Sequence, residues 1–416
     1  MQLHTLLRQR IARYGPMPFR RFMEAALYEP GLGYYAGSST RRAGRAGDFY
    51  TSVSVGPLFG ECLARQFAEM WRMAGSPPSF WLAEQGAMDG RLALDVLTGL
   101  RVADSQCFAA ARMALVDPFR PIQNASAAPD PASDLADKIV WLTKLDKDSL
   151  EAAAFSAGHP LDFAIVYSNE LIDAFPVCLI RYEGGAWKEL HIVAEEAATP
   201  DAFQFVPLPP ATPGLVAAIA RLSSVAEDEA LPAIEGYTTE INLEAAAWIR
   251  QASEMLPRGY VVTIDYGLPR RLYYSVERRE GTLRCFRQHR SSNDPLAHVG
   301  RQDITADVDF TTLAEEGLAC GLHTEGFVDQ QRFLMGNAPP LFSMQPGAAD
   351  VPPETVKTRG YQAQLRAWQS LTHPAMMGAK FHVLIQSKGM QSTGGAADGG
   401  GGLPLSGLRF ARPVTL

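Results

Sequence analysis

One segment organises this chain of 416 residues, and it reads Trp81-Leu82-Ala83-Glu84-Gln85-Gly86-Ala87-Met88-Asp89-Gly90-Arg91-Leu92. It starts as an apolar, strand-like run, breaks at glycine and restarts as a helix. A glycine at the carboxyl end of a buried parallel strand allows a tight turn, and the next helix points its free N–H groups and positive dipole end at a ligand. The pattern predicts a binding site for a nucleotide-like cofactor. The same pattern also occurs as a plain tight connection between a strand and a helix.

A second strand with an acidic end follows about 27 residues later. Ala114-Leu115-Val116 reads as a buried strand, and Asp117 ends it. In doubly wound nucleotide-binding folds, an acid at this place accepts hydrogen bonds from both hydroxyls of a ribose. Pro118 directly afterwards leaves a second interpretation open, in which Asp117 only caps the turn.

Short apolar strands alternate with helical segments from residue 81 onward. This alternation predicts an α/β fold, with a doubly wound, Rossmann-like sheet that is largely parallel and covered by helices on both faces. The candidate strands span residues 81–85, 112–117, 138–142, 162–168, 259–265, 282–287 and 381–386.

An N-terminal helical region precedes this sheet. Residues 1–75 read as helices with one glycine-rich loop, and Gly47-Asp48-Phe49-Tyr50-Thr51-Ser52 within that loop is a candidate lid. The stretch from Leu58 to Met73 has large apolar residues at helical spacing, which indicates core packing. This apolar stripe consists of Phe59, Leu63, Phe67 and Trp71.

The domain that contains the parallel sheet is expected to span residues 76–390, with inserts at about 178–250 and 270–370. Within the first insert, Cys178 to Val193 is broken by two glycines and reads as a hairpin on the edge of the sheet. The second insert is expected to form a cap over the cofactor site. Residues 391–416 read as a Gly-rich tail.

The composition excludes several classes of protein. A hydrophobic content of 47% with 20% charged residues is typical of a folded globular chain. The net charge of −7 and the pI near 5.7 argue against nucleic-acid binding, which requires clustered Lys and Arg. No run approaches the roughly 18 apolar residues of a membrane span. Five separated cysteines without a CxxC pair favour a reducing, cytoplasmic location and leave no zinc motif in view.

Several strings, in chain order, go beyond a generic nucleotide-binding fold. They include Gly15-Pro16-Met17-Pro18-Phe19, the lid string 47–52, Ser168-Asn169-Glu170-Leu171-Ile172-Asp173-Ala174-Phe175-Pro176-Val177 and Thr263-Ile264-Asp265-Tyr266-Gly267. These strings resemble the MidA-like family, whose members are class I S-adenosylmethionine-dependent methyltransferases, and the matches cover roughly residues 12 to 386.

The resemblance implies S-adenosylmethionine as cofactor and a protein as substrate. Mitochondrial relatives in the family imply a protein-arginine methyltransferase that assists assembly of respiratory complex I. Neither a nucleic-acid partner nor a membrane span is expected, and the oligomeric state stays open, with a homodimer as one alternative. The implied cofactor-binding residues are Glu84, Gly86, Gly90, Asp117, Thr51 and Ser52.

The candidate catalytic residues are Glu170, Asp173 and Asn169, just beyond the carboxyl end of a central strand. Methyl transfer from a sulfonium is an in-line displacement, so the protein mainly positions donor and acceptor. Carboxylates hold a guanidinium bidentately and draw its charge away from the attacking nitrogen. The alternative is that Asn169 and Asp173 cap the next helix. His289 and His298 flank Asp294 at a spacing that matches no metal motif, so no metal site is predicted.

Two strings depart from the family pattern. The family loop E-x-G-P-G-R-G reads here with Met88 and Asp89 in place of its middle glycine and its arginine, and the family string T-S-P-E ends here in Ser54. A long side chain and an added carboxylate in the loop oppose a ligand that approaches the backbone. They motivate an alternative, a non-catalytic assembly or interaction factor with a degenerate cofactor loop. A nicotinamide-dependent oxidoreductase shares the glycine turn but leaves the strings at 47–52 and 168–177 unexplained.

Overall fold

The computed structural model describes residues 2–37, 51–119, 135–195, 202–343, 358–390, 404–412 and 416. The chain divides into two compact units. The first comprises Met1–Tyr50, Ile172–Trp248 and Gly267–Leu313, and the second comprises Thr51–Leu171, Ile249–Tyr266 and Ala314–Leu416. The expected helical region 1–75 and the expected insert at 270–370 each contribute residues to both units, whereas nearly all of the expected insert at 178–250 lies in the first.

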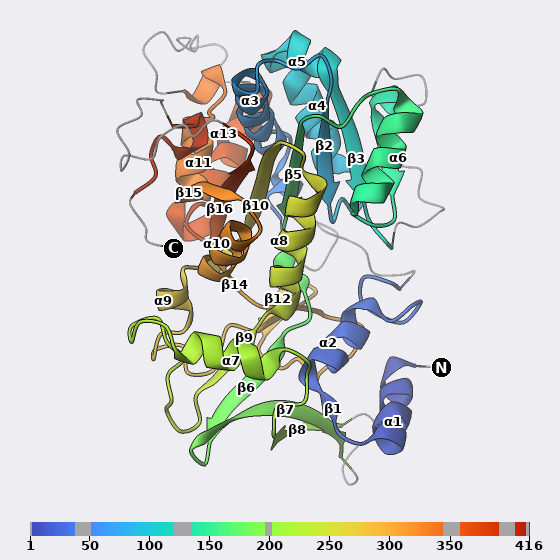
Figure 1. The fold of residues 1–416 in the computed structure, drawn as a ribbon, viewed down its shortest axis with the longest axis vertical. Helices are drawn as coiled ribbons and strands as arrows, with labels where there is room; N and C mark the ends of the chain where they lie inside the picture. The colour runs from blue at the N-terminus through green and yellow to red at the C-terminus, as the bar shows by residue number, and fades with distance from the viewer. Residues whose placement is uncertain are drawn as a thin grey trace. The chain divides into compact units, whose positions relative to one another are not determined.

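The second unit contains the predicted parallel sheet (Figure 1). Its strands lie in the order β15-β16-β10-β5-β2-β3-β4. If these strands are numbered one to seven along the chain, the order is 6-7-5-4-1-2-3. The strands β10, β5, β2, β3 and β4 are parallel, and β16 is antiparallel to both β10 and β15. The doubly wound α/β prediction is therefore confirmed. The strands are β2 (Phe80–Gln85), β3 (Ala111–Val116), β4 (Ile139–Leu142), β5 (Ala164–Asn169), β10 (Gly259–Leu268), β15 (His323–Asp329) and β16 (Phe381–Lys388).

The order reverses between β2 and β5, the first and fourth of these strands. In an open α/β sheet, ligands bind in the crevice outside the carboxyl ends of the strands at such a reversal. The segments that follow β2 and β5 are therefore the ones that the fold places at a ligand site.

Helices pack against this sheet through apolar faces. The predicted stripe of α3 is confirmed, since Phe59, Leu63, Phe67 and Trp71 are all buried in the main core of the unit. The helices with residues in this unit are α3 (Leu58–Met73), α4 (Arg91–Ala103), α5 (Ser105–Ala110), α6 (Lys147–Ala157), α8 (Leu243–Met255), α10 (Phe310–Ala319), α11 (Gln330–Gly336) and α13 (Arg359–Thr372). Among the described residues, no helix is long and apolar enough to cross a membrane.

The chain end is tied to α3. Ser406 donates to Glu69 from both its backbone N–H and its hydroxyl, each at 2.8 Å, and Gly407 N–H donates to Gln66 Oε1 at 2.9 Å. Leu405 beside them is buried. Residues 404–412 thus pack on the second unit, while the glycine-rich part of the predicted tail, 391–403, lies outside the described residues.

The first unit is built on a different sheet. Its strands lie in the order β1-β7-β6-β9, with β8 paired to β7. They are β1 (Met17–Pro18), β6 (Cys178–Glu183), β7 (Ala186–Ala194), β8 (Phe203–Leu208) and β9 (Thr238–Ile241). The predicted hairpin at Cys178 to Val193 is confirmed as β6 and β7, but its placement on the edge of the parallel sheet is wrong. Because β6 also pairs with β9 and β7 with β8, the hairpin lies at the centre of its own antiparallel sheet.

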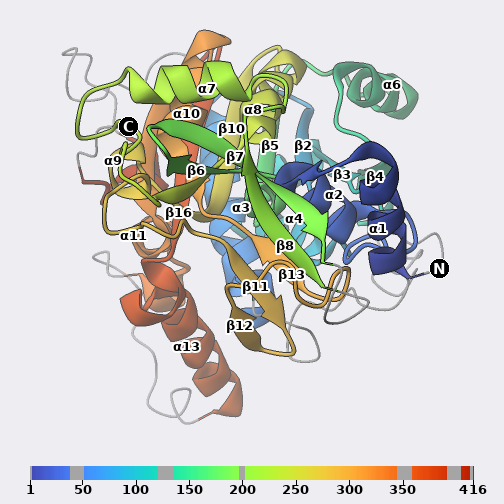
Figure 2. The same ribbon diagram turned by 90° about the horizontal axis from the view of Figure 1, so that it is seen from below.

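A small antiparallel sheet completes the first unit, in the order β12-β11-β13 (Figure 2). Its strands are β11 (Arg284–Arg287), β12 (Arg290–Ser292) and β13 (Asp303–Thr305), and β14 (Val308–Asp309) pairs with the end of β10. The expectation that residues 282–287 join the parallel sheet is therefore wrong, since they form β11. The strand β15, rich in polar residues, was missed by the apolar pattern. The helices of this unit are α1 (Leu3–Tyr14), α2 (Phe19–Tyr28), α7 (Leu215–Ser223) and α9 (Arg270–Tyr273).

Candidate functional site

The loops after β2 and β5 meet at the reversal of the strand order. Gln85 and Ser168 are register partners at the ends of these two strands. A methyl group added to Gly86 would lie only 3.0 Å from Cδ1 of Leu171, so the two loops are in direct contact. The predicted cofactor loop and the predicted catalytic segment 168–171 therefore share one edge of the sheet.

The cofactor loop turns by left-handed backbone at three positions. Gly86, Met88 and Gly90 have φ of 77°, 47° and 78°. The loop is anchored to β3, because the backbone N–H groups of Gly86 and Ala87 donate to the carbonyl of Val116 at 2.9 and 3.3 Å. The sequence-based view of this glycine turn is correct in geometry, and α4 begins directly after it.

Gly90 lies against large side chains. A methyl group there would come within 3.0 Å of Leu115 Cδ1 and 3.1 Å of Trp141 Cζ2. Trp141, considered from sequence as either a core residue or an adenine-stacking ring, thus lies beside the cofactor loop and is half-buried. Its contact with Gly90 is compatible with a core residue and with a ring that stacks on an adenine.

The two departures from the family loop have clear structural consequences. Met88 occupies a left-handed position that glycine adopts without strain, whereas a side chain there costs roughly 1–2 kcal/mol. Asp89 accepts a hydrogen bond from the N–H of Arg91 at 3.1 Å. Its carboxylate therefore satisfies one of the amides at the start of α4 that have no partner within the helix.

Glu84 lies beneath the loop as a buried carboxyl group. The hydroxyl of Tyr167 donates to Glu84 Oε2 at 2.8 Å. Burial raises the pKa of Glu84 to about 8, against the Tyr167 hydrogen bond, which lowers it. Near neutral pH the side chain is therefore largely protonated. Tyr167 was not singled out from sequence, because an aromatic residue in a buried strand gives no sign of its hydroxyl partner.

Asp117 lies at the end of β3 and is buried. Its Oδ1 accepts from Phe119 N–H at 2.7 Å, and its own N–H donates to the carbonyl of Leu142 at 3.2 Å. The turn-capping interpretation is thus realised. It does not conflict with ribose binding, because a carboxylate has acceptor capacity for several donors.

The backbone of Glu170 is in a strained, left-handed conformation. It follows β5 directly, with φ of 52°, and its N–H donates to the carbonyl of Ile264 at 3.0 Å. Non-glycine residues in this region cost of order 1–3 kcal/mol and cluster at active sites. Its Oε1 accepts from the N–H of Ser52 at 3.2 Å and from Nδ2 of Asn169 at 3.1 Å. The carboxylate is therefore held in a fixed orientation.

Asn169 adds an acceptor beside this carboxylate. Its Oδ1 is buried and has no hydrogen-bond partner within the described part of the chain. A buried amide oxygen without a donor is costly, so such an atom in a native site points to a missing ligand group. At a helix cap this oxygen would accept from a backbone N–H. Because it has no donor among the described residues, Asn169 does not cap a helix.

The segment that holds the Glu170 carboxylate through Ser52 begins with a tight turn at Thr51. Thr51 and Ser54 form a reciprocal pair, in which each N–H donates to the hydroxyl of the other at 3.0 and 3.1 Å. This is the arrangement of a capping box, where a glutamate normally takes the second position. Ser54 thus takes the position that the glutamate holds in a capping box. The remaining lid residues 47–50 lie outside the described residues.

Gln330 is a site residue that the motif analysis did not assign. The hydroxyl of Ser52 donates to its Oε1 at 3.0 Å, and its Nε2 donates to the carbonyl of Leu371 at 3.0 Å. It is fully buried at the start of α11. Gln330 also matches the family pattern, and this match was the only signal in the sequence. Its contacts come from segments far away in the chain.

Asp173 belongs to the first unit, unlike Glu170 and Asn169. It is buried in a short 3-10 turn, Ile172–Ala174, so it does not cap a following helix. Its carbonyl accepts from the N–H of Ala306 at 2.9 Å. Together with burial and Asp303, it raises the pKa of Tyr35 well above the usual range. Within the first unit, Asp173 thus lies near the aromatic side chain of Tyr35 and the acidic side chain of Asp303.

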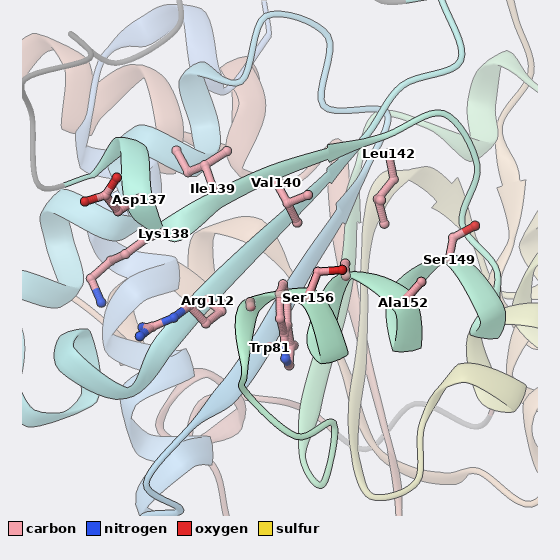
Figure 3. A pocket seen from close by; sticks show the side chains of 12 residues that line it. Trp81, Arg112, Asp137, Lys138, Ile139, Val140, Leu142, Ser149, Ala152 and Ser156 are labelled. Atoms are coloured by element: carbon pink, nitrogen blue, oxygen red, sulfur yellow. The ribbon is translucent and has the colours of Figure 1, made fainter.

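A groove of about 510 Å³ lies elsewhere in the second unit, between α6 and the outer strand β4 (Figure 3). Its lining includes Trp81, Arg112, Val140 and Ser156, and none of the predicted site residues. It is therefore separate from the reversal of strand order. In the described ranges, no group of three or more His, Cys, Asp or Glu side chains is placed to hold a metal ion.

Known proteins resemble this chain in sequence and in fold. A family model described as "Putative S-adenosyl-L-methionine-dependent methyltransferase" matches residues 62–328. The protein arginine methyltransferase NDUFAF7 homolog, mitochondrial, of Drosophila melanogaster is 28% identical over 397 residues, 92% of this chain and 84% of the relative. The mitochondrial NDUFAF7 of Rattus norvegicus is 26% identical over 390 residues, 90% of this chain and 82% of the relative.

A solved structure extends the likeness to the whole fold. A Burkholderia thailandensis protein, crystallised with bound S-adenosyl-homocysteine, superposes with a TM-score of 0.77 at 30% identity, over 98% of this chain and 94% of that one. The family model covers well over half of this chain, and the sheet has its crevice where a cofactor loop is formed. The chain therefore belongs to the family of class I S-adenosyl-L-methionine-dependent methyltransferases.

Proposed function

We propose that this methyltransferase transfers a methyl group from S-adenosylmethionine to an arginine side chain of a protein. One observation carries the choice of acceptor. At the crevice, the oriented carboxylate of Glu170 lies beside the buried, unpaired Oδ1 of Asn169. Two neighbouring acceptors suit a planar cation with several N–H donors, and the guanidinium is the side chain with that geometry. The names of the curated relatives, protein arginine methyltransferases, support the same choice.

The residues of the second unit fit the cofactor. The left-handed turn at Gly86 and Gly90 carries no Cβ at the carboxyl end of β2, which suits a ligand that approaches the backbone. Asp117 would accept from ribose hydroxyls, and Thr51 and Ser52 would lie at the rim of the site. The bound cofactor supplies an electrophilic methyl group on a sulfonium. Glu170 and Asn169 would orient the guanidinium, and the carboxylate would draw charge away from the attacking nitrogen. The new N–CH₃ bond forms as the S–CH₃ bond breaks, and one proton leaves the guanidinium.

Methyl labelling tests the acceptor. The purified protein is incubated with S-adenosylmethionine carrying a labelled methyl group and with an extract of cells that lack this gene, and the protein fraction is hydrolysed. Label in methylarginine is the expected result. Label in another amino acid, in small molecules or in nucleic acid would contradict the arginine proposal.

A non-catalytic assembly factor is the second candidate, and the strained Met88 with the neighbouring Asp89 favours it. It differs from the main proposal in a measurable way, because it predicts a folded protein that does not bind S-adenosylmethionine. Calorimetric titration of the purified protein, after removal of any ligand that co-purifies, separates the two.

Met88→Gly is expected to tighten cofactor binding about threefold to tenfold, since it removes backbone strain and side-chain bulk at the loop. Calorimetry on both proteins measures the change. Ser76→Gly is the matched control, because Ser76 also has a positive φ, 52°, but lies in an exposed turn after α3. An equal change in both variants, or none in Met88→Gly, would show that position 88 does not limit binding.

Asp117→Asn is expected to weaken cofactor binding about tenfold, since a charged acceptor contributes roughly 1.5–3 kcal/mol per hydrogen bond. Asparagine keeps an oxygen for the Phe119 N–H, so the turn is retained. Asp294→Asn is the control, because Asp294 accepts from Leu296 N–H in the same local pattern at 3.0 Å. Unchanged affinity in Asp117→Asn would remove Asp117 from the cofactor site.

A further inference from the structure

The hairpin of β11 and β12 in the first unit brings two arginines together without neutralising them. Arg287 and Arg290 are direct cross-strand partners. Like charges directly opposite each other on an antiparallel pair are destabilising. In the described residues, neither arginine makes an ion pair, and the recorded contact of Arg287 is Nη1 to His298 Nε2 at 3.5 Å. The hairpin thus holds two positive charges next to each other, and their repulsion destabilises it.

The same hairpin carries backbone strain. Its two-residue turn consists of Gln288 and His289, with φ of 51° and 60°. Such turns strongly prefer glycine, asparagine or aspartate, because both central residues are left-handed. His298, which lies against Arg287, also has a positive φ, 47°. Of the six described non-glycine residues with positive φ, three gather here and two, Met88 and Glu170, lie at the crevice.

A partner in solution can reach the positive charge of this hairpin. Gln288, His289, Arg290 and the following serines are exposed, and so is Arg301, whose N–H donates to the carbonyl of His298. The strand β12 forms the outer member of its three-stranded sheet. Asp294, four residues after Arg290, accepts from the N–H of Leu296 and makes no ion pair with either arginine in the described residues. The two adjacent positive charges therefore attract carboxylates.

We propose that the hairpin Arg287–Arg290 is a docking surface for an extended acidic segment of a protein partner. In the extended partner, side chains that point to one face are spaced about 6.5–7 Å apart, which is compatible with two carboxylates meeting two opposed guanidiniums. This inference rests on the proposed function, in which the partner is the protein substrate. It adds that the protein substrate carries an extended acidic segment.

Fluorescence anisotropy with a labelled peptide of alternating glutamate and alanine tests the proposal, with an alternating glutamine and alanine peptide as reference. The full-length double variant Arg287→Glu with Arg290→Glu is expected to bind the glutamate peptide at least about tenfold more weakly at low salt. The control double variant, Arg13→Glu with Arg366→Glu, makes the same change in net charge at exposed sites and is expected to retain affinity. Equal losses in both would overturn the proposal.

Two further measurements complete the design. The neutral variant Arg287→Gln with Arg290→Gln should lose peptide binding without a fall in melting temperature, because it also removes the like-charge pair. A single-stranded oligonucleotide of equal charge serves as competitor, and its tighter binding would instead identify a nucleic-acid surface. Peptide binding needs no methyl transfer. Therefore, binding without methylarginine formation would contradict the proposed function alone, and methylarginine formation without binding would contradict this inference alone.

Discussion

Glu170→Gln is expected to lower the rate of arginine methylation by about 100-fold or more while cofactor affinity stays within about threefold. The reason is the placement of this carboxylate at the reversal of strand order, fixed by Ser52 and Asn169 and held on left-handed backbone. Glutamine has nearly the same shape and keeps one oxygen for these two donors. What it removes is the negative charge that holds the guanidinium and draws its charge from the attacking nitrogen.

Single-turnover transfer and calorimetry are the two measurements for this variant. Glu151→Gln is the control, because Glu151 is exposed on α6, away from the crevice. If Glu170→Gln lost methylation and cofactor binding together, Glu170 would be a residue that supports the cofactor loop. If it lost neither, the acceptor would be bound elsewhere.

Much of the fold could be predicted from the sequence because local patterns determine it. Apolar strands, helical spacing and the glycine turn at Gly86 are local, and they correctly indicated the parallel sheet and α3. The strand β15 was missed because its alternating polar residues lack the apolar run of a central strand. Residues 282–287 were assigned to the wrong sheet because the apolar pattern of a strand does not say which strands it pairs with, here its hairpin partner β12 and the later strand β13.

The site was predictable only in part, for a related reason. Glu170 and Asn169 follow a recognisable strand, so their place at the sheet edge could be inferred. Their partners Ser52 and Gln330 come from other parts of the chain, and the contact of Ser52 with Gln330 spans 278 residues. The bonds of Ser54 could not be inferred from the family string, because the reciprocal pair with Thr51 depends on the local turn of the backbone.

The stability of the protein is expected to depend on pH through Glu84. Burial raises the folded-state pKa of Glu84 to about 8 from the ordinary value of 4.5, so between these pH values the folded state holds a proton that the unfolded state has released. The stabilising contribution is complete below pH 4.5 and is lost as pH rises to about 8. Relative to Glu84→Gln, the wild type should lose up to about 1 kcal/mol of unfolding free energy per pH unit in this window.

Urea unfolding of both proteins across this pH range measures the difference. Asp95→Asn is a useful comparison, because burial raises the pKa of Asp95 only to about 6, so its window should close about two pH units earlier. A constant free-energy difference between wild type and Glu84→Gln from pH 5 to pH 8 would contradict the assignment of a buried, protonated carboxyl group.

The same protonation distinguishes two roles of Glu84 in cofactor binding. If the cationic amino group of S-adenosylmethionine contacts this carboxyl, the ionised form is favoured, and binding at pH 7 releases a proton to the buffer. If Glu84 only holds the loop through Tyr167, it keeps its proton and the wild type releases none from this group. Calorimetry in buffers with different ionisation enthalpies measures the release. Glu84→Gln, which has no proton to lose, identifies the residue that provides it.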